Sequence, residues 1–329
     1  MRRARGGWIC LLALLIFAAC GKPQAMGEPT ELLVGASDEI WEVLEDEVIA
    51  SLEPTTLTVR NEAIFEVAHR DPAGDEWRDL RAMRQIVLIG SAGDPAVAEV
   101  LATLDAPPPQ PPTLFQAQNV WALNQSVSVV LLPPGADPLA ARPLLRQLST
   151  TLVHQLEQYA AARMFVSGAN EELADSLRRN AGFTLRIPHV YRFEEREPGV
   201  FIFRNDQPDP ATLIRNITVA SRPVTSVTLT PAALATWREE LVARLTQPPQ
   251  LTGALSNSAA EPGAAYTQIE GTWTNPPDQW PAGGIFITRA TTCGSREFLI
   301  DAWLYAPGQP KYEYDYQLPT ILQSFRCAE

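Results

Sequence analysis

Histidine and cysteine are scarce in this chain of 329 residues, which contains three histidines and four cysteines. Most structural zinc sites need four such ligands close together, so the composition leaves little material for a metal centre. Basic residues are also outnumbered, with 26 Lys and Arg against 38 Asp and Glu and a net charge of −12. Because phosphate backbones are bound by clustered basic side chains, nucleic acid is not expected as a partner.

Sequence signatures of known catalytic and cofactor sites are missing as well. The chain has no Gly-x-Ser-x-Gly turn, no Gly-x-Gly-x-x-Gly or phosphate-binding loop, and no His-Glu-x-x-His pattern. Residues 90–93 (Gly-Ser-Ala-Gly) favour a strand-to-helix turn capped by Asp94, although such a turn can also cup an anion. We therefore assign no catalytic residue, no metal and no cofactor, and we lean away from an enzyme.

The three histidines do not form a catalytic constellation. The local patterns predict that His69 and His189 each lie on the apolar face of a strand, where a hydrogen-bonded, half-buried histidine is commoner than a general base. His154 is expected on the polar side of a helix. Its i, i+3 spacing to Glu157 is one that two metal ligands can share, but a single pair of this kind does not make a site.

One apolar run near the N-terminus predicts where the protein is located. Residues 8–19 are uninterruptedly apolar and follow three arginines, a pattern too short for a membrane span of about 20 residues but typical of a secretory signal. The boundary Phe17-Ala18-Ala19-Cys20 resembles a bacterial lipobox. We predict a signal peptide over residues 1–19 and lipid attachment at Cys20; an ordinary cleaved signal is the alternative.

Lipidation would hold the mature chain firmly in a membrane, because each buried methylene contributes about 0.8 kcal/mol. The residue after Cys20 is glycine and not aspartate, which by analogy with Gram-negative sorting favours the outer membrane. Residues 20–29 are polar and turn-forming, so they predict a short lipid-anchored tether. We expect a cell-envelope lipoprotein that faces the periplasm.

Two of the four cysteines remain once Cys10 leaves with the signal and Cys20 carries lipid. In an oxidising periplasm the remaining Cys293 and Cys327 are expected to form a disulfide, while two free thiols are the alternative. No Cys-x-x-Cys spacing indicates a redox motif.

The rest of the chain predicts an α+β fold, with mixed or antiparallel sheets packed with helices. An N-terminal half (30–166) and a C-terminal half (167–329) show a similar order of strands, Pro-initiated helices and Pro-Gly turns. That similarity favours two related halves from an internal duplication, with common turn chemistry as the alternative. Leucines spaced three or four apart predict a helix over residues 143–165. Alternation over residues 183–193 predicts a strand or bent hairpin arm, and residues 318–325 a final helix.

Aromatic residues gather near the C-terminus, where residues 258–329 contain eleven, about 15% against 8% in the whole chain. Trp273, Trp280, Trp303 and Tyr305 are the candidate ligand-binding residues, since exposed Trp and Tyr stack on sugar rings or anchor protein interfaces. Burial between a sheet and helices is the commoner alternative. Tyrosines alternate with acidic residues over 312–316, which predicts that one face of that stretch meets water.

Short Gly, Pro and Trp signatures in the mature chain resemble an uncharacterised bacterial family. The signatures are Gly271-Thr272-Trp273, Gly283-Gly284-Ile285-Phe286, Tyr305-Ala306-Pro307-Gly308 with Lys311, Arg215-Asn216-Ile217, and Asn119-Val120-Trp121 with Gln125. The family is the domain of unknown function 4837, which looks like a set of lipoproteins of Bacteroidetes-type bacteria. The resemblance runs over most of the mature chain and implies a lipoprotein, but it carries over no catalytic residue.

Together these patterns favour a cell-envelope lipoprotein that is a non-enzymatic binding or assembly component, with envelope proteins or polysaccharide as partners besides the membrane. The alternative is an envelope hydrolase with an unrecognised site around His189. A cleft that places His189 beside a serine or carboxylate would favour the hydrolase, whereas a continuous exposed Trp and Tyr patch would favour binding.

Overall fold

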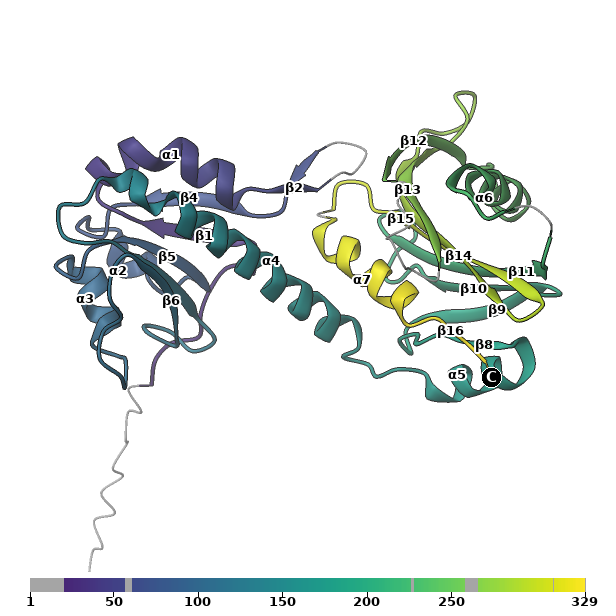
Figure 1. Cartoon of the computed structure of the whole chain (residues 1–329), viewed down its shortest axis with the longest axis horizontal. Helices are drawn as coiled ribbons and strands as arrows, with labels where there is room; N and C mark the ends of the chain where they lie inside the picture. Colours follow the sequence, from purple (N-terminus) through teal and green to yellow (C-terminus); the bar gives the residue numbers. More distant parts are fainter. Residues whose placement is uncertain (1–20, 57–60, 226–227, 258–265, 310, 329) are drawn as a thin grey trace, which may run out of the picture.

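A computed structural model describes residues 21–56, 61–225, 228–257, 266–309 and 311–328. The predicted signal peptide (1–19) and Cys20 lie outside these residues. The described chain confirms the α+β class: one large sheet lies in each half, and the long helix α4 runs from the first half to the second (Figure 1). In the described ranges, no helix combines the length and the apolar character that a membrane crossing requires.

The N-terminal sheet has the strand order β4-β1-β5-β7-β6. Strands β1, β4, β5 and β7 pair in parallel, and β6 pairs antiparallel to β7. Their bounds are Glu31–Gly35 (β1), Glu66–Arg70 (β4), Gln85–Gly90 (β5), Thr113–Gln118 (β6) and Ser126–Leu131 (β7). The central strands β5 and β7 are buried almost throughout, as expected for parallel strands covered on both faces.

Helices cover both faces of this sheet. Helices α1 (Asp38–Leu52) and α4 (Arg142–Met164) pack on one face, and α2 (Trp77–Leu80) and α3 (Pro95–Leu101) pack on the other. The predicted helix over 143–165 is thus confirmed within one residue at each end. A 3₁₀ turn (Pro138–Ala141) precedes α4, and a two-stranded ribbon of β2 (Thr55–Thr56) and β3 (Glu62–Ala63) follows α1.

The C-terminal sheet is antiparallel, with the strand order β12-β13-β14-β15-β11-β10-β9. The bounds are Arg192–Glu197 (β9), Val200–Asn205 (β10), Ile214–Pro223 (β11), Leu251–Asn257 (β12), Thr267–Thr274 (β13), Gly283–Cys293 (β14) and Arg296–Tyr305 (β15). Helix α6 (Pro231–Leu245) lies on one face. Helices α5 (Glu171–Ala181) and α7 (Tyr312–Gln323), with β8 (Phe183–Thr184) and β16 (Arg326–Cys327), cover the other.

The two halves are not copies of one unit. Four parallel strands dominate the N-terminal sheet, whereas the pairings in the C-terminal sheet are all antiparallel, and the strand numbers and orders differ. The predicted internal duplication is therefore wrong. Its basis was shared turn chemistry, and the same Pro and Gly signals start and stop elements in any topology.

Two local predictions also need correction. The alternation over 183–193 is a real burial pattern, with Leu185, Ile187 and Tyr191 in the core, but it is not one strand: β8 ends at Thr184 and pairs with β16, and β9 of the large sheet begins only at Arg192. Pro188 lies in this interval and has no N–H to donate to a strand ladder. The final helix begins at Tyr312, six residues earlier than predicted.

Helix α7 joins the two halves. Tyr312 and Tyr316 project onto the N-terminal core, while Leu318 and Ile321 belong to the C-terminal core, so the tyrosine stretch is helical and partly buried. Polar contacts cross at the same place: Arg163 of α4 pairs with Glu313 at 2.9 Å, Lys311 pairs with Glu62, and the Thr56 hydroxyl donates to Asp315 at 2.6 Å.

Residues 21–28, part of the predicted tether, are hydrogen-bonded to the N-terminal half. The Ala25 amide donates to the Leu123 carbonyl at 2.9 Å, and the Arg84 amide donates to the Met26 carbonyl at 2.7 Å. The sequence showed no apolar pattern here because backbone groups make these contacts.

Cys293 and Cys327 form a disulfide with a Cα–Cα distance of 5.5 Å, which ties the end of β14 to β16. Their separation of 34 residues is in the range where a disulfide stabilises by about 3–4 kcal/mol. Replacing both cysteines by serine should lower the free energy of unfolding by about 3 kcal/mol in urea titrations. Under reducing conditions the two proteins should unfold alike, and equal stability when oxidised would contradict the prediction.

Candidate functional site

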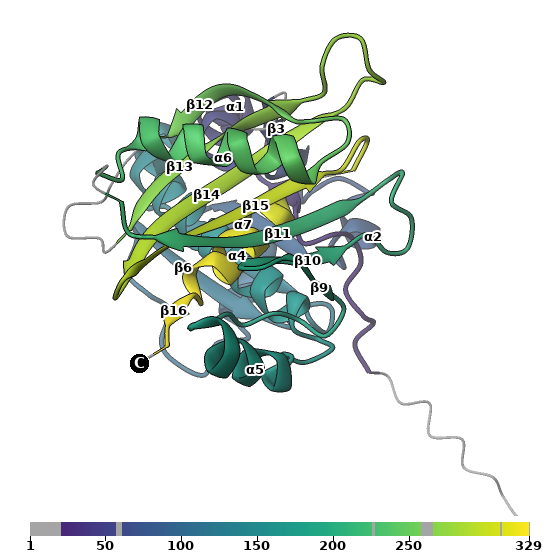
Figure 2. The same cartoon turned by 90° about the vertical axis from the view of Figure 1, so that its right-hand side faces the viewer.

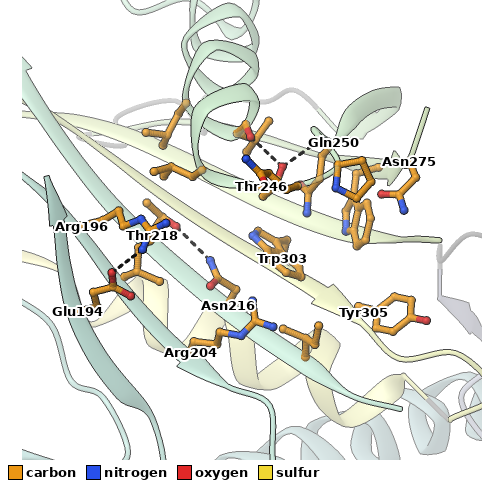
Figure 3. A pocket seen from close by; sticks show the side chains of 18 of the residues that line it. Glu194, Arg196, Arg204, Asn216, Thr218, Thr246, Gln250, Asn275, Trp303 and Tyr305 are labelled. Atoms are coloured by element: carbon orange, nitrogen blue, oxygen red, sulfur yellow. Dashed lines mark hydrogen bonds and ion pairs between the residues drawn. The ribbon is translucent and has the colours of Figure 1, made fainter. Parts of the chain in front are cut away.

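A pocket of about 370 Å³ opens on the α6 face of the C-terminal sheet. Helix α6 lies over β13, β14 and β15, and its side chains also pack against Val200 of β10 and Ala220 of β11 (Figure 2). The pocket lies between the C-terminal end of α6 and strands β9, β10, β11 and β15 (Figure 3). All four aromatic residues singled out in the sequence line it, together with polar side chains from β9, β10, β11 and the segment after α6.

Strand register explains why the aromatic residues meet polar partners. Trp303 and Tyr305 lie two apart on β15, so they face the same side of the sheet. Across the antiparallel pair, Trp303 is opposite Asn216 and Tyr305 is opposite Ile214 on β11. Thr218, two residues beyond Asn216, faces the same side. The pocket floor is therefore an aromatic stripe beside an amide and a hydroxyl.

The aromatic residues form a graded cluster from core to surface. Trp273 and Trp303 contact each other edge to face with ring centroids 5.5 Å apart, and are 3% and 7% exposed. Trp280, in the segment between β13 and β14, is 54% exposed and meets Tyr305 edge to face at 5.9 Å. The two alternatives from the sequence, exposed aromatic residues and buried ones, thus each hold in part: Trp273 and Trp303 are buried, and Trp280 is open to solvent.

Neutral hydrogen-bonding groups line the walls. The Asn216 amide donates to the Thr218 hydroxyl at 3.1 Å, and both side chains are almost wholly buried in the floor (Figure 3). Gln250 is held by its backbone N–H, which donates to the Thr246 hydroxyl at 3.1 Å. The Asn275 amide donates to the Trp280 carbonyl at 2.9 Å and so fixes the loop that carries the exposed tryptophan.

Charged residues lie at the β9–β10 side of the pocket, and each is paired. Arg196 pairs with Glu194 at 2.9 Å, and Arg204 pairs with Asp206 at 2.9 Å. Burial acts to raise the pKa of Asp206, but the hydrogen bond and charge of Arg204 and the charge of Arg192 outweigh it and hold the pKa below its usual value. The carboxylates therefore neutralise the arginines at the edge of the pocket.

A buried ion pair between α6 and β15 holds one wall of the pocket in place. Arg238 of α6 and Asp301 of β15 are 0% and 1% exposed, and the Arg238 Nε donates to the Asp301 carboxylate at 2.9 Å. The same guanidinium donates to Gln250 Oε1 at 2.9 Å and lies 3.6 Å from the Phe286 ring centroid. Arg238 thereby fixes Gln250, one of the walls of the pocket.

The histidines do not contribute to this pocket. The His69 ring hydrogen-bonds the Ala36 carbonyl at 2.9 Å and stacks on Trp41, so it is the hydrogen-bonded, half-buried histidine that the sequence favoured over a general base. His154 is exposed beside Glu157. His189 is exposed in a turn, so its predicted place on a buried strand face is wrong, because the chain has left the sheet there. Within the described ranges its ring has no hydrogen bond to a serine or carboxylate.

The turn at residues 90–93 leads from β5 into α3 as predicted, but the side chain of Asp94, at the N-cap position, makes no capping hydrogen bond to α3. The Ser91 amide donates to the Asp94 carboxylate at 2.5 Å, and Pro95 opens α3. Among the described residues, three or more His, Cys, Asp or Glu side chains are nowhere grouped as metal ligands would be.

Sequence reasoning missed most of the polar walls. Asn216 stood out only inside the Arg215-Asn216-Ile217 signature, and Thr218, Gln250 and Asn275 gave no signal. A polar residue on a strand or loop looks solvent-facing until the register and the position of α6 are known.

No protein-family model matches the chain, and no curated protein matches its sequence. Solved structures match 45% of it: cyanobacterial PsbP of Synechocystis sp. PCC 6803 (17% identity, TM-score 0.32, 87% of that chain) and the Ran-binding protein Mog1p of Saccharomyces cerevisiae (11%, 0.32, 91%). LpqN of Mycobacterium tuberculosis, involved in cell envelope biogenesis, matches at 12% identity and a TM-score of 0.30 over 83% of its chain. At these values the likenesses assign no activity, ligand or partner to this chain.

Proposed function

We propose that this protein is a lipid-anchored, non-enzymatic binding component of the cell envelope, and that the pocket beside α6 binds a saccharide. The observation that carries the proposal is the aromatic stripe of Trp303, Tyr305 and Trp280 next to neutral amide and hydroxyl groups. Apolar sugar faces stack on such rings, and sugar hydroxyls pair with amides and hydroxyls. The pocket volume of about 370 Å³ lies within the range of small-molecule sites.

The position of the pocket is compatible with anchoring through Cys20. Gly21 begins the described chain on the N-terminal half, and the C-terminal sheet lies toward the opposite end of the long axis (Figure 1). An acylated Cys20 would therefore hold the N-terminal half near the membrane and leave the saccharide pocket facing away. The outer-membrane location and membership of the lipoprotein family with unknown function belong to the same proposal.

Binding fits the pocket better than hydrolysis does. Among the described lining residues Glu194 is the one carboxylate, and it is paired with Arg196. Glycoside hydrolysis by the common mechanism uses two carboxylates that flank the scissile bond. Among its described lining residues the pocket presents aromatic rings, amides and hydroxyls that can bind a sugar, but not two carboxylates.

The test is binding of envelope polysaccharide fractions and a glycan array by the purified protein and by Trp280→Ala. Trp280 is largely exposed, so its loss should leave the fold intact and weaken binding about tenfold, which is 1.4 kcal/mol. Phe193→Ala is the matched control, because Phe193 is an exposed aromatic that contacts the Phe203 ring, with centroids 5.4 Å apart, on the opposite sheet face. Unchanged binding by Trp280→Ala, or no glycan bound by the folded protein, would refute the proposal.

A further inference from the structure

A second cavity, of about 490 Å³, lies in the N-terminal half and has no part in the saccharide pocket. It opens where α4 extends beyond the ends of the strands, at the first residues of β5 and β7 and the last residue of β6. Apolar side chains of Phe65, Leu152 and Leu156 form part of its lining. The cavity is therefore a slot between the ends of these strands and one helix, and its lining is completed by Arg84 in a bend and Asn124 in a turn.

Carboxamide side chains dominate its polar lining: Gln85, Gln118, Asn124, Gln155 and Gln158. Register places two of them on either side of Ser126 of β7, because Gln85 of β5 and Gln118 of β6 are each paired with that residue. The Gln118 amide donates to the Ser126 hydroxyl at 3.2 Å. Carboxamides offer both a donor and an acceptor, which is the complement of a peptide group.

One of these carboxamides lacks a partner. The Oε1 atom of Gln85 is buried and accepts no hydrogen bond from the described residues. Leaving a buried acceptor unpaired is costly, so native structures normally satisfy such atoms. Because Gln85 lines the cavity, a ligand there that brings an N–H or O–H donor satisfies this atom once the side chain turns toward it.

Arg84 is the charged residue among the described residues that line the cavity. Its Nε donates to the Gly27 carbonyl at 3.0 Å, and it forms no ion pair with a described carboxylate. In a chain with a net charge of −12, a guanidinium without a carboxylate partner beside neutral amides favours a ligand with one negative charge.

The walls are held in place before any ligand binds. Gln125 is fully buried; its Oε1 accepts from the Trp121 amide at 2.8 Å, and its Nε2 donates to the Arg81 and Met83 carbonyls. This joins the turn that carries Asn124 to the segment that carries Arg84. It gives a structural role to Gln125, which stood out in the sequence after Asn119-Val120-Trp121. A preformed site loses less entropy on binding.

We propose that this cavity binds the carboxyl-terminal end of a short peptide. The terminal carboxylate pairs with the Arg84 guanidinium, a peptide N–H donates to Gln85 Oε1, and the neighbouring carboxamides pair with the remaining peptide groups. Small side chains of the peptide contact Phe65, Leu152 and Leu156. The site is independent of the saccharide pocket, and either can fail without the other.

The test is calorimetric titration of the purified protein with N-acetyl-trialanine, as the free acid and as the C-terminal amide. The free acid should bind at least tenfold more tightly than the amide, because the amide lacks the charge that pairs with Arg84. In Arg84→Gln that preference should disappear, and in Arg84→Lys part of it should remain. Arg78→Gln, which removes an exposed arginine of α2, is the matched control and should bind as the wild type does.

Gln85→Leu gives a second, independent readout. It should weaken binding of the free acid and the amide by a similar factor, since both use the same peptide N–H, and it should not lower the thermal stability of the free protein. Trp280→Ala should bind the peptide unchanged, which separates this site from the saccharide pocket. Equal affinity for acid and amide, a preference retained in folded Arg84→Gln, or no binding at millimolar peptide would overturn the proposal.

Discussion

Replacing Arg238 with alanine should destabilise the protein by about 3–5 kcal/mol. Asp301 is 1% exposed, and without the guanidinium its carboxylate would remain buried with the Thr288 hydroxyl, at 2.6 Å, as its one hydrogen-bond partner among the described residues. The substitution also removes the cation that lies over the Phe286 ring and frees Gln250 from its hydrogen bond. Urea denaturation followed by circular dichroism measures the loss.

The double variant Arg238→Met with Asp301→Leu separates charge from packing. Replacing both partners of a buried ion pair by apolar residues of similar volume is often neutral or stabilising, whereas removing one partner leaves the other charge buried and unpaired. The double variant should therefore recover most of the stability that Arg238→Ala loses. A loss of less than about 1 kcal/mol for the single variant would mean that water or movement of α6 satisfies Asp301.

Replacing Asp315 with asparagine should stabilise the protein above neutral pH. Burial, the largest cause, raises the pKa of Asp315 to about 7, with Glu62 and Glu270 acting in the same direction against the Thr56 hydrogen bond and the charge of Lys311. Folding therefore favours the protonated carboxyl, and asparagine keeps an acceptor for the Thr56 hydroxyl without the charge. At pH 8 the expected gain is on the order of 4 kcal/mol.

The pH window follows from the direction of that shift. In the unfolded chain the carboxyl ionises near its ordinary value of 3.8, whereas in the folded protein it ionises near 7. The wild type should lose stability relative to the variant between about pH 4 and pH 7, and the difference should then stay constant. Asp46→Asn, at an exposed position on α1, is the matched control for an Asp-to-Asn change on a helix. A difference that is the same at pH 4 and pH 8 would contradict the prediction.

The first of these results concerns a contact within the C-terminal half, and the second concerns the contact between the two halves. Arg238 and Asp301 connect α6 to the sheet beneath the saccharide pocket, and Asp315 lies on α7, where the two cores meet. Loss of the first contact should disturb the pocket wall at Gln250. Ionisation of the second should loosen the contact of α7 with the β2–β3 ribbon.

Several features of this protein were determined by sequence pattern alone. The α+β class followed from alternating strand and helix signals, and the 3.6-residue period of leucines located α4 within one residue at each end. Elimination among four cysteines pointed to the pair that is bonded, Cys293 and Cys327. Composition marked the C-terminal aromatic residues as candidates, and the structure brings the four named ones to one pocket.

Tertiary structure decided the rest, because it depends on which distant segments become neighbours. Asn216 lies beside Trp303 only through the register of β11 against β15, since the two residues are 87 positions apart in the sequence. Arg238 falls on the buried side of α6, where its charge is tolerated only because Asp301 faces it. The second cavity, in the N-terminal half, likewise exists only because the ends of β5, β6 and β7 meet α4. Periodicity reports which face of an element is apolar, whereas pairing between elements sets which polar groups come together.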